Sequence, residues 1–280
     1  MITEWSDLFR PGEASSFLDR RPLPLFHPQA TAFDANNAWW LAELSRLVYR
    51  HDIEESPFLP QPRRTDFLAQ VGLRQVAFFN AKHEGTQGFL VESFEGTPFA
   101  ALVFRGTDDL RDWLTNLNVP HATGHDIPGL VHKGFLRALD AVWQDVASAL
   151  ADITVPVFYA GHSMGAALAT LAAARKPPQA LYAFGSPRIG DDVFAQAFTT
   201  IPAYRLVHNE DPVVEHPSGG FGYTHIGELR ALHSFPAPPP VEWQAWFSTL
   251  RSVPAPLADH APIHYSRCLA ATSRPLGKDG

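Results

Sequence analysis

One stretch of the chain, from Ile153 to Ala174, contains no Asp, Glu, Lys or Arg and is long enough to cross a bilayer. Pro156 and the segment Gly161-His162-Ser163-Met164-Gly165 interrupt this stretch. The half before that segment is rich in β-branched and aromatic residues, and the half after it is rich in alanine. A buried strand followed by a buried helix explains this division better than a transmembrane helix does. The stretch therefore predicts a strand–turn–helix unit inside a globular protein.

The charge and the cysteine content limit what kind of protein this chain forms. The 280 residues include 22 basic and 29 acidic residues, for a net charge of −7, which argues against a nucleic-acid-binding protein. Cys268 is the only cysteine, so no intramolecular disulfide forms, as in reducing compartments and in many exported bacterial proteins. On the last predicted helix, Cys268 is expected to be a small core residue. The N-terminus has no basic region followed by an apolar one, so we expect either a cytoplasmic protein or export without a recognisable signal peptide.

Strands and helices alternate after residue 100, which predicts a largely parallel sheet flanked by helices. Before residue 100, two strands joined by the turn at residues 95–98 form a predicted hairpin, which adds an antiparallel part. No linker divides the chain, so we expect one domain over residues 1–280, with an irregular extension at residues 1–35. The predicted strands span residues 74–80, 88–94, 99–105, 155–159, 180–184 and 204–207, with a short hairpin at 222–232. The predicted helices span residues 36–50, 65–72, 130–151, 164–176, 193–199, 243–250 and 263–272.

Ser163 is the candidate nucleophile. It lies at the centre of a G-x-S-x-G motif, after a β run that ends at Ala160 and before the Ala-rich helix. This strand–turn–helix context presents a serine on a sharp turn, where Gly161 and Gly165 approach each other and leave no room for a Cβ. The N-terminus of the helix stabilises developing negative charge, and the N–H of Met164 can donate to an oxyanion.

Seven segments of the chain form a distinctive set. They are Val103-Phe104-Arg105-Gly106-Thr107, Asp112-Trp113-Leu114-Thr115-Asn116-Leu117, Val131-His132-Lys133-Gly134-Phe135, Gly161-His162-Ser163-Met164-Gly165, Phe184-Gly185-Ser186-Pro187-Arg188-Ile189-Gly190, Arg205-Leu206-Val207-His208-Asn209-Glu210-Asp211-Pro212-Val213 and Gly222-Tyr223-Thr224-His225-Ile226-Gly227. Together these segments resemble the class 3, fungal-type lipase family, over about residues 36–272. This resemblance implies an α/β-hydrolase fold with a mostly parallel central sheet, an antiparallel N-terminal portion and helices on both faces. It also implies hydrolysis of carboxylic esters, commonly glycerides, with no metal or organic cofactor.

A serine nucleophile needs a base and an acid, which follow it in the chain order Ser, Asp or Glu, His in this fold. Asp211 comes a few residues after a predicted strand and matches the acid position of the family. Asp191 and Asp192 are alternatives, but they open a predicted helix, where negative charge is favoured by the helix dipole.

Several histidines follow Asp211 and remain candidates for the base: His216, His225, His233, His260 and His264. Asp259-His260, with Tyr265 five residues after the histidine, resembles the family's Asp-His segment and implies that His260 is the base. His264 is the alternative, and His225 is expected to have a structural hydrogen-bonding role. We expect Asp259 to cap a helix or face solvent, because adjacent side chains rarely reach the geometry that a triad needs.

The resemblance further implies that Thr107 completes the oxyanion hole together with Met164. The next residues, about 108–119, place Leu110, Trp113, Leu114 and Leu117 at the spacing of an amphipathic helix. Their position matches the family's mobile lid, although the spacing alone also fits a helix packed on the core. His121 and His125 could suggest a metal site, but no third ligand is close in sequence.

The candidate triad, together with the family resemblance, implies a serine carboxylic-ester hydrolase of the lipase type that cleaves acylglycerols or related lipid esters through an acyl-enzyme. Its expected partners are an ester substrate and, transiently, a lipid–water interface, with no nucleic acid, transmembrane segment, metal or cofactor. Two alternatives remain: an esterase or phospholipase with the same triad, and a catalytically silent interaction module.

Overall fold

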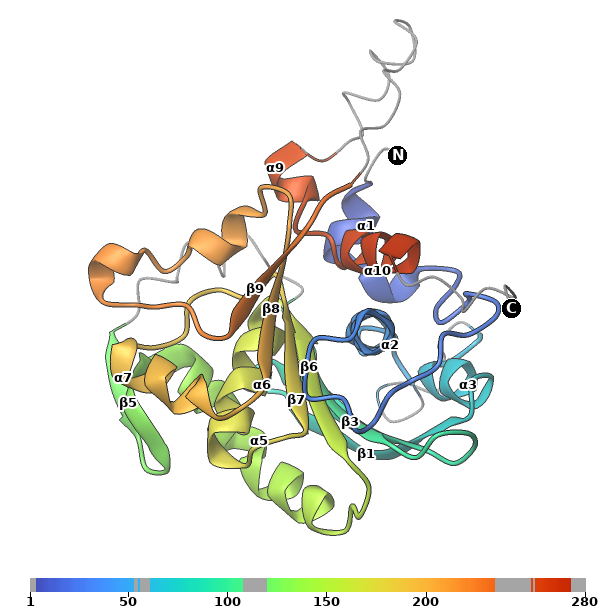
Figure 1. Cartoon of the computed structure of the whole chain (residues 1–280), viewed down its shortest axis with the longest axis horizontal. Coiled ribbons are helices and arrows are strands. Elements are labelled where there is room, and N and C mark those ends of the chain that lie inside the picture. The colour runs from blue at the N-terminus through green and yellow to red at the C-terminus, as the bar shows by residue number, and fades with distance from the viewer. Residues whose placement is uncertain are drawn as a thin grey trace, which may run out of the picture.

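A seven-stranded sheet forms the centre of the molecule, with the strand order β1-β2-β3-β6-β7-β8-β9 (Figure 1). The computed structural model describes residues 4–52, 55, 61–107, 120–234, 253 and 255–272. Strands β1, β2 and β3 pair antiparallel, and β3, β6, β7, β8 and β9 pair parallel. The strands are β1 (Leu73–Ala81), β2 (Thr86–Ser93), β3 (Ala100–Phe104), β6 (Val157–His162), β7 (Ala180–Phe184), β8 (Ala203–His208) and β9 (Glu228–Leu232).

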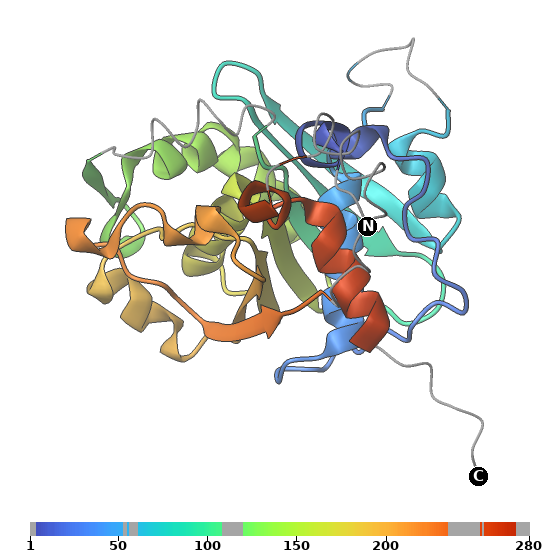
Figure 2. The same cartoon turned by 90° about the horizontal axis from the view of Figure 1, so that it is seen from above.

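Helices cover both faces of this sheet (Figures 1 and 2). On one face, α2 and α10 share a buried apolar cluster with β3, β6 and β7, and on the other face α5 and α6 share a second cluster with the same strands. Helix α2 begins after Asp34, whose carboxylate accepts a hydrogen bond from the N–H of Asn37 (2.9 Å), as expected of a helix cap. The helices are α1 (Trp5–Phe9), α2 (Ala35–Leu47), α3 (Arg64–Ala69), α5 (Lys133–Ala151), α6 (Met164–Arg175), α7 (Asp192–Gln196), α9 (Ala255–Ala258) and α10 (Pro262–Thr272).

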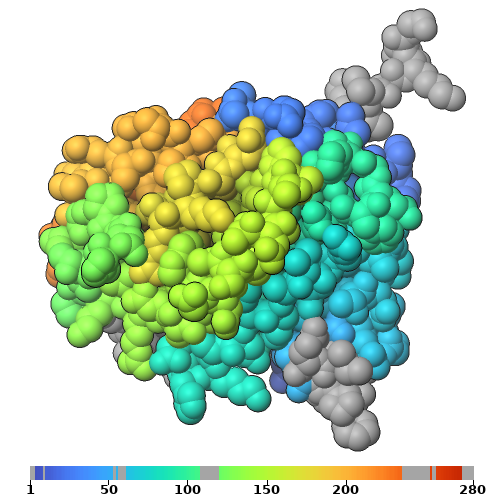
Figure 3. All heavy atoms as spheres, turned by 90° about the horizontal axis from the view of Figure 1, so that it is seen from below, coloured from blue at the N-terminus to red at the C-terminus, as the bar shows by residue number. Residues whose placement is uncertain are grey.

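A separate hairpin, β4 (His121–Gly124) with β5 (Ile127–His132), lies beside the main sheet. Figure 3 shows the surface of α5 between this hairpin, in green, and strands β1 and β2. The described residues also contain the short 3₁₀ turns η1 (Pro11–Glu13), η2 (Ala197–Thr199), η3 (Pro212–Glu215) and η4 (Gly219–Phe221).

The predicted fold class is confirmed: a mostly parallel sheet with an antiparallel portion on its N-terminal side and helices on both faces. The uncharged stretch folds as strand β6, a turn and helix α6, as predicted. Within the described parts of the chain, no helix is both long and apolar enough to cross a membrane.

Two local predictions are wrong. The helix expected from residue 130 begins at Lys133, because residues 130–132 belong to β5 and His132 caps the helix by accepting hydrogen bonds from two backbone N–H groups through Nδ1. The hairpin expected at residues 222–232 does not form. Gly227, with φ of +72°, turns the chain so that β9 joins the edge of the sheet in parallel with β8.

Two expectations concerned segments outside the sheet. The stretch before α2 contains α1 and η1, which the sequence did not predict. The helix expected at residues 243–250 lies outside the described residues.

Candidate active site

Ser163 occupies the sharp turn between β6 and α6. Its backbone has φ of 58° and ψ of −126°, a strained conformation for a residue with a side chain. The turn closes because both flanking glycines touch backbone: a Cβ on Gly161 would lie 2.3 Å from Gly165, and one on Gly165 would lie 2.2 Å from the carbonyl oxygen of Phe104. Ser163 is buried, and its Oγ has no hydrogen-bond partner among the described residues.

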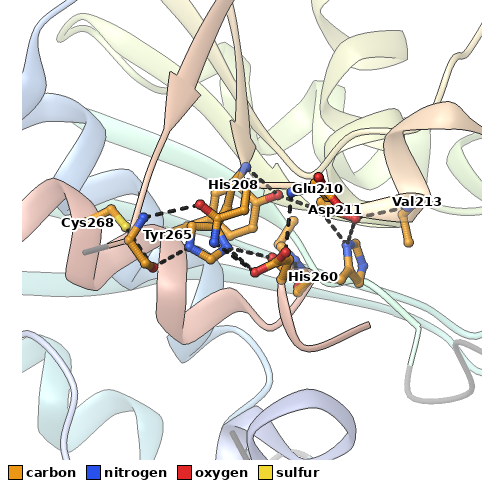
Figure 4. A network of polar contacts seen from close by, with 11 residues as sticks. His208, Glu210, Asp211, Val213, His260, Tyr265 and Cys268 are labelled. Carbon is orange, nitrogen blue, oxygen red and sulfur yellow. Dashed lines mark hydrogen bonds and ion pairs between the residues drawn. The ribbon is translucent and has the colours of Figure 1, made fainter. Parts of the chain in front are cut away.

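Asp211 and His260 form a buried pair from distant parts of the chain (Figure 4). Asp211 follows β8 and caps η3, whereas His260 lies in the turn between α9 and α10. The Nδ1 atom of His260 lies 2.8 Å from Oδ2 and 3.0 Å from Oδ1 of Asp211. The structure thus brings together the sequence-predicted acid and one of the candidate bases.

Two further donors hold the Asp211 carboxylate. The N–H of Val213 donates to Oδ1 (2.9 Å), and the hydroxyl of Tyr265 donates to Oδ2 (2.5 Å). Burial disfavours the charged form of Asp211, but attraction to His260 and the hydrogen bonds from His260 and Tyr265 outweigh it and lower the pKa of the carboxyl below its usual value. An ionised Asp211 only accepts hydrogen bonds, so Nδ1 of His260 carries a proton and donates.

Nε2 is the ring nitrogen of His260 that does not contact Asp211. It is buried and, like Oγ of Ser163, has no hydrogen-bond partner among the described residues. Buried polar atoms without partners are uncommon, and a catalytic role is one explanation for them. In a neutral imidazole with a proton on Nδ1, Nε2 is the acceptor that a general base needs.

His162 connects the nucleophile turn to the loop of the candidate base. Its Nε2 donates to the carbonyl oxygen of His260 (2.8 Å), and the two rings lie 4.5 Å apart between centroids. Burial, followed by repulsion from His260, lowers the pKa of His162 to about 3. His162 is therefore neutral at physiological pH and serves as a hydrogen-bond donor between the two segments.

The other histidines after Asp211 lie elsewhere. His264 stacks on His208, with ring centroids 5.0 Å apart, and burial, with the nearby charges of His208 and Arg267, lowers the pKa of His264 to about 4. Burial likewise lowers the pKa of His225 to about 4. His216 and His233 are exposed. Among these residues the geometry favours His260.

The oxyanion candidates lie on either side of the Ser163 turn. Helix α6 begins at Met164, so the Met164 N–H belongs to the first helical turn and has no partner within the helix. Thr107 follows Gly106, where a Cβ would lie 3.3 Å from Cβ of Ser163 and 2.9 Å from the carbonyl oxygen of His162. The backbone after β3 thus reaches the nucleophile turn just before Thr107, and the oxyanion role of both residues stays a prediction.

Several candidates from the sequence lie away from this centre or outside the described residues. Asp191 caps α7 by accepting from the N–H of Phe194 (2.9 Å), and Asp192 accepts from the hydroxyl of Thr224 (2.5 Å). The described residues hold no group of three or more side chains suited to a metal ion, and the ring of His121 stacks on Tyr223 instead. Half-buried Cys268 lies 3.6 Å from the hydroxyl of Ser234. The predicted lid residues, Leu110, Trp113, Leu114 and Leu117, are all outside the described residues.

Sequence reasoning did not assign roles to two residues that contact the Asp211–His260 pair. Tyr265 donates to Asp211, and burial together with the adjacent carboxylate raises the pKa of Tyr265, which keeps its hydroxyl protonated. Gly185 has φ of +56°, and a Cβ at this position would lie only 2.7 Å from Oδ2 of Asp211. The spacing of five residues between His260 and Tyr265 was the available signal for the tyrosine.

Residues 101–221 match the family model described as lipase (class 3). Over these residues the chain is similar to the class 3 lipases. The chain is also 41% identical over 133 residues to secreted mono- and diacylglycerol lipase 1 of Fusarium solani, covering 43% of this chain and 40% of that protein. It is 33% identical over 144 residues to a lipase of Rhizomucor miehei, covering 45% of this chain and 40% of that protein. The chain thus spans about 40% of the length of these curated relatives.

A solved structure of similar architecture confirms the α/β-hydrolase fold. It is a triacylglycerol lipase whose catalytic centre is described as a serine protease triad. The TM-score is 0.62 and the identity 25%, with 72% of this chain and 82% of that chain covered. The resemblance to the class 3 lipases that the sequence motifs indicate is therefore confirmed.

Proposed function

We propose that this chain is a serine carboxylic-ester hydrolase of the lipase type, with Ser163 as nucleophile, His260 as base and Asp211 as the supporting acid. The buried contact between Asp211 and Nδ1 of His260 carries the proposal, because it orients the ring and leaves Nε2 free as an acceptor. The adjacent turn presents Ser163 on a strained backbone, as this chemistry requires.

In the proposed reaction, Nε2 of His260 takes the proton of Ser163 as Oγ attacks the ester carbonyl carbon. The resulting tetrahedral oxyanion accepts hydrogen bonds from the N–H groups of Thr107 and Met164. His260 then gives its proton to the departing alcohol, and an acyl-enzyme remains. His260 then takes a proton from water as the water oxygen attacks this ester, and it gives that proton to Oγ of Ser163 as the fatty acid leaves. Asp211 stays ionised and stabilises the imidazolium throughout.

Acylglycerols are the proposed substrates. The Fusarium relative is named a mono- and diacylglycerol lipase, and the matched structure is a triacylglycerol lipase. Residues 108–119 are proposed as a lid whose apolar face covers the site in water and meets lipid when it opens. Because the Fusarium relative is named a secreted lipase, we also propose that the protein acts outside the cell.

Hydrolysis assays with the purified chain test this function. The substrates are an emulsified diacylglycerol, a short soluble ester and a phospholipid vesicle, each assayed with the wild type and with Ser163→Ala. We expect diacylglycerol hydrolysis that rises once droplets form, and a loss of at least about a thousandfold in Ser163→Ala. Cleavage of only the soluble ester, or preferred cleavage of the phospholipid, would replace the lipase assignment with esterase or phospholipase. No hydrolysis of any ester would refute the proposed function.

A further inference from the structure

We propose that Asp259 is a positioning residue that ties the loop of His260 to the turn of Asp211. This inference rests on the proposed function, because it concerns how the proposed base and acid are kept at hydrogen-bond distance. Asp259 directly precedes His260, and residues 208–210 directly precede Asp211. A contact between these two neighbouring segments therefore sets the separation of the catalytic pair.

The side chain of Asp259 accepts from two consecutive residues of that turn. Its Oδ1 accepts from Nδ2 of Asn209 (2.9 Å), and its Oδ2 accepts from the backbone N–H of Glu210 (3.3 Å). Because both carboxylate oxygens act as acceptors, the contact depends on the carboxylate and not only on a polar group of the same size.

The backbone of Asp259 makes a third contact with the same turn. Its carbonyl oxygen lies 3.0 Å from Nδ1 of buried His208, and Nδ1 donates because a carbonyl oxygen only accepts. Figure 4 shows His208 and Glu210 of this turn beside the pair of Asp211 and His260. We call Asp259, His208, Asn209 and the N–H of Glu210 the Asp259 clamp.

The clamp is itself anchored to the edge of the sheet. Asn209 adopts φ of +43°, and its N–H donates to the carbonyl oxygen of Leu232 at the end of β9 (2.9 Å). Ser234, two residues on, reaches Nε2 of His208 with its hydroxyl (2.6 Å) and donates its N–H to Oδ1 of Asn209 (3.3 Å). Asp259 therefore binds a turn that β8 and β9 already hold in place, and this contact restrains the position of His260.

Other contacts keep the fold when the clamp is broken, which makes the proposal testable. Asp211 retains Val213 and Tyr265, and the carbonyl oxygen of His260 retains His162. Loss of Asp259 is thus expected to change the geometry of the pair rather than unfold the chain. A displacement of about 1 Å at a catalytic group can reduce the rate on the order of a hundredfold.

The proposed perturbation is Asp259→Asn, which replaces one acceptor oxygen with a donor NH₂. In either amide orientation, that NH₂ faces a donor of Asn209 or of Glu210. Adding Asn209→Asp repairs the pattern, because the amide then donates to the new carboxylate and its oxygen still accepts from Glu210. Asp191→Asn is the matched control. It removes one charge from another half-buried aspartate that accepts a backbone N–H, but this one caps α7.

Three readouts are compared. The melting temperature of each variant is measured first. Below it we measure kcat and KM on a short soluble ester, and the low-field proton resonance of the bond between His260 Nδ1 and Asp211. We expect Asp259→Asn to lower kcat at least about tenfold with KM little changed, and to shift or broaden the resonance. We expect the added Asn209→Asp to recover most of kcat and the wild-type resonance, and Asp191→Asn to match the wild type in both.

Either an unchanged kcat and resonance in Asp259→Asn, or no recovery of both readouts in the double variant, would overturn the inference. A wild type that hydrolyses no ester would refute the proposed function instead. In that case the resonance still tests whether Asp259 positions His260. An equal resonance in the wild type and in Asp259→Asn rejects this role. A resonance that changes in Asp259→Asn and returns in the double variant supports it.

Discussion

Gly185→Ala tests whether the space beside the Asp211–His260 pair is needed for activity. Gly185 directly follows β7, and its φ of +56° lies in the left-handed region. A Cβ at this position would lie 2.7 Å from Oδ2 of Asp211, 2.9 Å from the hydroxyl of Tyr265 and 3.2 Å from Cε1 of His260. The added methyl group therefore meets three members of the site at once.

The expected magnitude has two parts. An alanine with positive φ costs roughly 1–2 kcal/mol of stability. The contact with Asp211 adds about 1–3 kcal/mol, as for other overpacked positions, because neither a buried carboxylate nor its partners can withdraw freely. The carboxylate relieves the contact by moving away from the methyl group. If this shifts the His260 ring by about 1 Å, kcat falls on the order of a hundredfold.

Gly85→Ala is the control for backbone strain. Gly85 has φ of +66°, and a Cβ there would meet nothing within 4 Å. Urea unfolding measures stability, and initial rates on a short soluble ester measure kcat for both variants. We expect both variants to lose stability through the backbone, but only Gly185→Ala to lose activity. If Gly185→Ala hydrolyses the ester as fast as Gly85→Ala, the contact does not control the catalytic geometry and the reasoning is refuted.

Two further predictions concern the groups around the pair. Tyr265→Phe removes a hydrogen-bond donor from the buried carboxylate of Asp211. Urea unfolding should therefore show that the free energy of unfolding falls by about 1.5–3 kcal/mol, and ester assays should show a reduced kcat. An unchanged free energy of unfolding would contradict this contact. The pKa of His162 is about 3 in the fold and about 6.5 when unfolded, so the unfolded chain binds the extra proton between these values. The free energy of unfolding should therefore fall as the pH decreases from about 6.5, and His162 should contribute up to about 1.4 kcal/mol per pH unit to this fall. If a His162→Asn variant lost stability with pH as steeply as the wild type, this prediction would be contradicted.

The turn at Ser163 was predictable from sequence because all of its determinants are local. A β run, two glycines flanking Ser163 and an Ala-rich helix are adjacent along the chain, and their meaning does not depend on distant residues. Elements whose identity depends on long-range pairing were less predictable. The apolar residues Leu130 and Val131 fit the start of a helix or a strand, and only pairing with β4 makes them a strand. Strand β9 likewise exists through its pairing with β8.

The surroundings of the proposed acid and base likewise combine features that the sequence predicts locally with contacts that it does not reveal. Order along the chain and family resemblance suggested Asp211 and His260, but the sequence left His264 as an alternative. The structure distinguishes the two histidines, because His264 stacks on His208 whereas His260 contacts Asp211. Asp259 was expected to cap a helix or face solvent, which is wrong. Its side-chain partners are 49 and 50 residues away, and no local pattern reveals such contacts.

Covalent labelling by a fluorophosphonate tests the central claim most directly, because the probe reacts with a serine only when a neighbouring base activates it. The labelled chain is digested, and the modified peptide is identified by mass. The account predicts one adduct at Ser163, none in Ser163→Ala, labelling slowed at least about a thousandfold in His260→Ala, and near wild-type labelling in His264→Ala. An adduct at another serine, or labelling that depends on His264 and not on His260, would contradict the account.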